Sequence, residues 1–255
     1  MKQRNKWFWV FFVIFVIAVG VGAGYYFGQK DREQVYEDLA EENKKPQEET
    51  KQEEQTTDEP AEEEKTVEIP IDFSSLKEKN SEVYAWIRIP DTQVDYPILQ
   101  RASDDLYYLD HTIDGAEGLP CSIYTQSLNA QDFSDKNTVI YGHNMRNGSM
   151  FGTFRKLHEQ SNLTSPYVWI CTPKHTWRYK IFSVHTASVT GETYTLFSMA
   201  DEQFAEYLKS MKSASELQLD AEADKDDKVI TMSTCTGNSS TRFVIQAKRL
   251  EKGEN

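Results

Sequence analysis

The sequence lacks the short motifs that bind metals and nucleotides. It has only three cysteines and five histidines, and none of them forms a CxxC pair or an HExxH sequence, so a zinc site has little support. No P-loop or GxGxxG sequence is present, which argues equally against nucleotide binding. Lys and Arg number 28 against 41 Asp and Glu, and no basic cluster resembles a phosphate-binding face. We therefore expect no metal, no cofactor and no nucleic-acid partner.

Charged residues are also absent from residues 7–27, near the N-terminus. As a helix this segment would be about 31 Å long, the thickness of a bilayer core, so we predict a transmembrane anchor. Basic residues dominate the preceding tail, whereas both signs follow the segment. The positive-inside rule then places residues 1–6 in the cytoplasm and the C-terminal domain outside the cell. A cleaved signal peptide is the alternative, which the length of the apolar run disfavours.

Residues 28–68 are strongly acidic. The part from residue 31 contains 16 Asp and Glu against five Lys and Arg, and large apolar residues are almost missing. Such a segment cannot bury enough apolar surface to offset the entropy of ordering it. We predict a disordered linker over 28–68, with a helix at 31–45 as a possibility next to the membrane, and expect a spacer rather than a module that binds a basic partner.

Residues 69–255 form the predicted extracellular domain and read as mainly β. Short apolar runs between turn signals predict eight strands, which suits a barrel or a sandwich. These runs are Val83–Ile89, Val94–Leu99, Ser122–Gln126, Thr138–Tyr141, Val168–Thr172, Arg178–Ala187, Val229–Cys235 and Arg242–Arg249. A few peripheral helices are predicted at Phe73–Lys79, Asp104–Leu109, Phe151–Glu159 and Ala200–Met211.

The odd number of cysteines leaves at least one thiol free. Cys121 and Cys171 stand among apolar residues and are expected to be small buried hydrophobes. Cys235 instead ends a predicted strand, and Arg242 opens the next one. If the loop between them closes an antiparallel hairpin, the two Cβ atoms lie about 5 Å apart on one face. A guanidinium would then stand beside the thiolate, or beside the oxyanion that forms when sulfur attacks a carbonyl.

Among the histidines, His143 closes a predicted strand behind Gly142, a position from which it can project into a cleft as an acid or base. The residues alone thus favour a Cys235 nucleophile, a His143 acid/base and an Arg242 electrostatic group, which together imply acyl transfer through a thioester. An exposed cysteine beside an unrelated surface arginine is the alternative that the pattern leaves open.

These motifs resemble the sortase family, and class B in particular. The string Thr231–Cys235 is similar to the family's Thr-Leu-x-Thr-Cys signature, with Met in place of Leu. Arg242 matches the family's catalytic arginine, and Tyr141–Met145 resembles the class B histidine region. The helical stretch 200–211 is similar to a helix that class B enzymes carry before the cysteine strand. The resemblance covers roughly residues 69–250.

The resemblance implies an eight-stranded sortase-type β-barrel and a membrane-held cysteine transpeptidase on the outer face of a Gram-positive cell. In this reading Cys235 attacks the Thr carbonyl of an Asn-Pro-x-Thr-x type sorting signal, and an amine of peptidoglycan resolves the thioester. His143 would transfer protons and Arg242 would stabilise the oxyanion. The partners would be surface proteins with a C-terminal sorting signal and a peptidoglycan precursor or cross-bridge amine. The implied substrate-binding residues are Leu109, Ser233 and Thr234.

Other readings fit the sequence less well. L,D-transpeptidases place Arg almost directly after Cys in a Ser-x-Gly-Cys setting, which this chain lacks, and papain-like enzymes have Cys before His. A pilin-polymerising sortase and a non-catalytic, membrane-anchored adhesion domain remain as alternatives.

Overall fold

Eight strands close into a single barrel in the computed structural model of this chain, which describes residues 2–43, 71–159 and 165–251. Their order around the barrel is β1-β2-β3-β4-β7-β8-β6-β5, and β5 pairs with β1 to close it. The pairs β2/β3 and β4/β7 are parallel and the other pairs antiparallel. The strands are β1 (Val83–Arg88), β2 (Asp95–Leu99), β3 (Ile123–Thr125), β4 (Asn137–Tyr141), β5 (Tyr167–Cys171), β6 (Thr176–Ser188), β7 (Val229–Cys235) and β8 (Thr241–Arg249). The predicted mainly β, eight-stranded barrel is confirmed.

The strands read as almost continuous apolar runs because both of their faces are covered. All five residues of β2 are buried, as are the first six of β7. Trp86 and Ile87, neighbours on β1 whose side chains point to opposite faces, are both fully buried. A strand of this kind lacks the alternation of a half-exposed sheet, which is why its length and flanking turns identify it.

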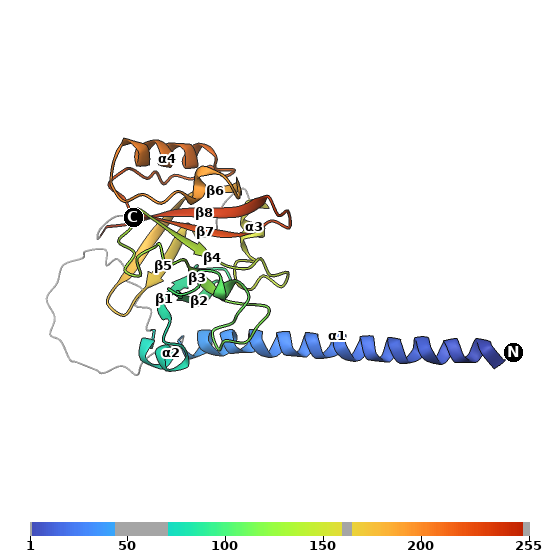
Figure 1. Ribbon diagram of the computed structural model, residues 1–255. Helices are drawn as coiled ribbons and strands as arrows, with labels where there is room; N and C mark the ends of the chain where they lie inside the picture. The colour runs from blue at the N-terminus through green and yellow to red at the C-terminus, as the bar shows by residue number, and fades with distance from the viewer. Residues whose placement is uncertain (1, 44–70, 160–164, 252–255) are drawn as a thin grey trace, which may run out of the picture.

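Short helices surround the barrel close to where they were predicted (Figure 1). Asp72 caps α2 (Phe73–Lys79), its side chain accepting from two backbone N–H groups, and Asp201 caps α4 (Glu202–Ser213) by accepting from the N–H of Phe204. The remaining short elements are α3 (Phe154–Glu159) and the 3-10 turns η1 (Tyr107–Leu109) and η2 (Glu192–Tyr194).

The N-terminal helix α1 (Lys2–Glu42) is much longer than the predicted anchor. It includes the apolar segment 7–27, which is long and apolar enough to cross a membrane, and it continues for 15 residues beyond Phe27. The predicted disorder is therefore wrong over residues 28–42, where the helix considered possible at 31–45 is present up to Glu42. Tyr36 and Leu39 are buried against the barrel, and this contact stabilises a segment whose composition alone favours disorder. The rest of the predicted linker, from residue 44, lies outside the described residues.

Candidate active site

The hairpin of β7 and β8 places Cys235 directly opposite Arg242, as the sequence predicts. The predicted pairing of Ser233 with Val244 is also present. Cys235 is exposed although the six residues before it in β7 are buried. The strand thus delivers one accessible thiol at the rim of the barrel, beside a guanidinium.

Arg242 is held in place by its own loop. Its Nη1 donates to the carbonyl oxygens of Thr241 at 2.7 Å and of Ser239 at 3.1 Å. The loop is closed by a contact of 2.7 Å between the hydroxyls of Thr236 and Thr241. These bonds tie the guanidinium to the strand end opposite Cys235, and among the described residues no carboxylate forms an ion pair with it.

His143 reaches the same rim through a second strand. β4 runs parallel to β7 with Tyr141 opposite Ser233, and the N–H of Gly142 donates to the carbonyl of Ser233 at 3.2 Å. Cys235 ends β7 two residues after Ser233, and His143 lies two residues beyond the end of β4. A Cβ at Gly142 would lie 2.4 Å from Ile123 Cδ1 and 2.8 Å from Phe151 Cδ2, so a larger residue here would displace these side chains. The parallel pairing therefore brings the predicted His, Cys and Arg together.

Hydrogen bonds orient the loop that follows β4. The Nε2 of His143 lies 2.7 Å from the carbonyl oxygen of Leu109. A carbonyl can only accept, so Nε2 carries the proton in this contact and Nδ1 is left as the other ring nitrogen. Asn144 donates from Nδ2 to the carbonyl oxygen of Cys235 at 2.6 Å. The histidine loop is thus tied directly to the cysteine strand.

The three predicted substrate-binding residues differ in accessibility. The side chain of Leu109 is 46% exposed at the end of η1, next to His143. Ser233 is buried and shares a hydrogen bond of 3.0 Å with the hydroxyl of Tyr194. Thr234 is 2% exposed, and its hydroxyl has no partner within the described part of the chain. Only Leu109 offers an apolar side-chain surface to a ligand.

A row of three tyrosines beside the site was not predicted. The rings of Tyr124 and Tyr141 stack at 5.4 Å, and those of Tyr141 and Tyr194 at 6.4 Å. Burial raises the pKa of Tyr194; the Arg242 guanidinium opposes this rise and a Cys235 thiolate adds to it. Tyr124 lies within β3, Tyr141 ends β4 and Tyr194 ends η2, so only the closed barrel brings the three rings together.

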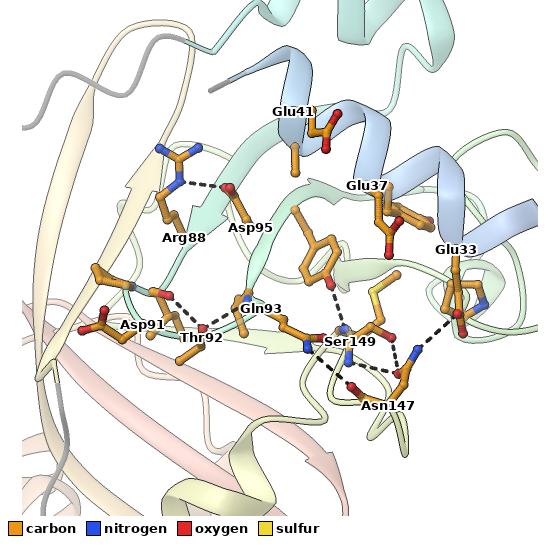
Figure 2. Close-up of a pocket in the computed structure, with 18 residues that line it drawn as sticks. Glu33, Glu37, Glu41, Arg88, Asp91, Thr92, Gln93, Asp95, Asn147 and Ser149 are labelled. Atoms are coloured by element: carbon orange, nitrogen blue, oxygen red, sulfur yellow. Dashed lines mark hydrogen bonds and ion pairs between the residues drawn. The ribbon is translucent and has the colours of Figure 1, made fainter. Parts of the chain in front are cut away.

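The chemistry of this rim is that of a nucleophilic thiol. An accessible sulfur, an adjacent fixed cation and an imidazole on the neighbouring strand are the groups that acyl transfer through a thioester requires. Among the described residues no cluster of His, Cys, Asp or Glu could hold a metal ion. A cavity of about 700 Å³ lies elsewhere, between α1 and the turn joining β1 and β2, and its lining includes the carboxylates of Glu33, Glu37 and Glu41 (Figure 2).

Comparison with known proteins agrees with this geometry. The family model described as Sortase domain matches residues 87–250. Sortase B of Listeria monocytogenes is 33% identical over 195 residues, covering 72% of this chain and 76% of the relative. The X-ray structure of Clostridium perfringens sortase B is 29% identical with a TM-score of 0.64, covering 70% of this chain and 99% of that one. A Staphylococcus aureus sortase B–substrate complex has a TM-score of 0.65 at 22% identity, covering 71% and 85%.

Fold and site together define a barrel-shaped cysteine transpeptidase. The chain belongs to the sortase family, and its relatives and structural neighbours place it in class B.

Proposed function

We propose that this sortase cleaves an Asn-Pro-x-Thr-x type sorting signal after Thr and joins the released acyl group to a peptidoglycan amine. The pairing of Cys235 with Arg242 at the barrel rim carries the proposal. It is supported by the similarity to a sortase B solved with a substrate. The proposed partners are surface proteins with a C-terminal sorting signal and a precursor or cross-bridge amine of the cell wall.

In the proposed mechanism the Cys235 thiolate attacks the Thr carbonyl carbon, and the carbonyl electrons move onto oxygen. Arg242, with a backbone N–H, donates to this oxyanion. When the C–N bond breaks, His143 protonates the leaving amine and a thioester remains. An incoming amine then attacks the thioester and transfers a proton to His143, and the C–S bond breaks to regenerate the Cys235 thiolate. His143 is suited to both steps because its loop is bonded to Leu109 and to the Cys235 strand.

The proposed location is the outer face of the membrane. The helix through residues 7–27 would span the bilayer once, with residues 1–6 in the cytoplasm and the barrel outside. This topology gives the enzyme access to both exported proteins and wall precursors. A cysteine-accessibility assay on intact cells tests it, since only an external Cys235 reacts with a membrane-impermeant thiol reagent.

The deciding experiment incubates the full chain with a panel of Asn-Pro-x-Thr-x peptides and candidate amines and follows thioester and product by mass spectrometry. The amines include a cross-bridge glycine peptide and a pilin-type lysine, which separate wall anchoring from pilus assembly. Cys235→Ala should abolish both species. Cys171→Ala is the matched control, because Cys171 is buried in β5. Absence of cleavage of every peptide, or unchanged cleavage by Cys235→Ala, would overturn the proposal.

A further inference from the structure

All three predicted catalytic residues lie at one end of the barrel, here called the catalytic end. β4 and β7 finish there, ahead of His143 and at Cys235, and β8 begins there beside Arg242. The opposite end carries the turn between β5 and β6, at residues 172–175. Figure 1 shows that the catalytic end points in the same direction as the N-terminal half of α1, whereas the C-terminal end of β8 points away from it.

The part of α1 nearest the apolar segment contacts the loops of the catalytic end. Arg32 donates from Nε to the carbonyl oxygen of Leu119 at 2.7 Å, in the loop that leads into β3. Glu33 accepts from the side-chain amide of Asn147 at 3.1 Å, in the loop that contains His143 (Figure 2). These two contacts join the helix to the two loops that flank the site.

One helical turn after Arg32, the buried side chain of Tyr36 contacts the loop that leads into β3. Its hydroxyl donates to the carbonyl oxygen of Cys121 at 2.6 Å and accepts from the N–H of Ile113 at 2.9 Å. The side chain is 3% exposed. Separating α1 from the loop would break these buried hydrogen bonds, which costs free energy. The helix and the loop are therefore held together as one unit.

The C-terminal end of α1 meets the other side of the domain. Glu42 forms an ion pair of 3.2 Å with Lys79 of α2, and Asn43 accepts from the N–H of Asp72 at 3.0 Å. The helix is therefore attached at both ends of its domain-facing segment. Because α1 runs unbroken from Lys2 to Glu42, the barrel cannot rotate freely about the anchor.

The length of the helix sets the height of the site above the membrane. Arg32 and Glu33 follow the last residue of the apolar segment by five and six positions, which is about 8 to 9 Å along a helix axis. The headgroup layer on each side of a bilayer is about 5 to 8 Å thick. The catalytic-end loops bonded to these residues accordingly lie at the outer edge of that layer.

We infer that α1 holds the catalytic end of the barrel against the headgroup layer, so that Cys235 faces the membrane. The partner surface is thus the lipid headgroup layer. This inference rests on the proposed function and on α1 as a membrane span.

The orientation can be measured without activity. Single cysteines at Ser239→Cys, in the loop between β7 and β8, and at Lys174→Cys, in the turn between β5 and β6, are labelled with a fluorophore. Both sites are exposed, and both variants carry Cys235→Ala so that the native thiol does not react. The full chain is placed in vesicles with a headgroup-linked energy acceptor. Transfer should be several-fold stronger from position 239. Equal transfer, or stronger transfer from position 174, would overturn the inference.

The consequence for catalysis needs a second measurement. A flexible Gly/Ser hexapeptide inserted between Gly28 and Gln29 leaves the contacts of Arg32 and Tyr36 in place but frees the barrel from the anchor. We expect the rate on a vesicle-anchored sorting peptide to fall by about fivefold or more, with an unchanged rate on the soluble peptide. The same insertion between Thr56 and Thr57 is the control and should alter neither rate.

Unchanged rates on the anchored peptide after the first insertion would refute the catalytic consequence. An enzyme that cleaves neither peptide would instead refute the proposed function, and the energy-transfer result would still report the orientation. The two failures are therefore distinguishable.

Discussion

Replacing Tyr36 by Phe removes one buried oxygen from the contact between α1 and the barrel. The hydroxyl binds the carbonyl of Cys121, the N–H of Ile113 and the hydroxyl of Ser122 at 2.6, 2.9 and 3.0 Å. The ring remains, and with it the edge contact to Tyr96 at 5.9 Å between centroids. The substitution therefore tests the polar part of the contact almost alone.

The expected cost follows from what the lost oxygen leaves behind. The buried N–H of Ile113 loses its partner, which costs about 1–3 kcal/mol, and the bond to Cys121 contributed a further net 0.5–1.5 kcal/mol or so. Together these weaken docking of α1 by about 2–4 kcal/mol, roughly a 30- to 1,000-fold change in its opening equilibrium. The barrel strands keep their own ladders, so the opening should be local.

Hydrogen exchange of the full chain in detergent micelles measures this opening. Amides of residues 110–122 and of the domain-facing part of α1 should exchange faster in Tyr36→Phe, while β7 and β8 stay protected. Tyr25→Phe, at a position 59% exposed on the same helix, is the matched control. Exchange in residues 110–122 that matches the control would show that the hydroxyl does not hold the helix, and would refute the reasoning.

Three further predictions concern the site and the stability of the barrel. Arg242→Ala should lower kcat/KM by about 10²- to 10³-fold, as the loss of an oxyanion donor does, and Arg242→Lys should restore little because an ammonium lacks the planar fork; a Lys variant within tenfold of the parent in the peptide assay would contradict this role. Gly142→Ala places a Cβ 2.4 Å from Ile123 Cδ1 and 2.8 Å from Phe151 Cδ2, so urea unfolding should show a loss of about 1–3 kcal/mol, and an unchanged midpoint would count against it. Burial lowers the pKa of His185 from 6.5 to about 4. Between these two pH values the unfolded chain binds a proton at this residue and the folded chain does not. The contribution to the free energy of unfolding is therefore complete above pH 6.5, and it falls by up to about 3 kcal/mol as the pH drops to 4. His185→Gln should flatten this pH dependence of unfolding, and identical slopes for parent and variant would disprove the assignment.

The features that the sequence predicts correctly depend on residues close together in the chain. The strands follow from short apolar runs between turns, and the Cys235–Arg242 pair follows from one hairpin whose two strands are separated by five residues. Hairpin register is a short-range property, so the sequence by itself determined it. The apolar anchor is equally local, because its length and lack of charge can be counted.

Contacts between distant segments were decided by the tertiary structure alone. His143 reaches Cys235 only through the parallel pairing of β4 with β7, whose paired residues Tyr141 and Ser233 are 92 positions apart. Closure of the barrel likewise buries Thr234, which the strand pattern could not reveal.

The length of α1 shows most clearly the difference between what the local sequence predicts and what the tertiary structure decides. The composition of residues 28–42 favours disorder and leaves a helix at 31–45 only as a possibility. The few apolar residues, Tyr36 and Leu39 among them, form too sparse a stripe to predict that such a helix is buried. The surface that receives them includes a loop some 75 to 85 residues further along the chain, and it exists only once the barrel has closed. Burial against that surface, rather than helix propensity, orders the segment.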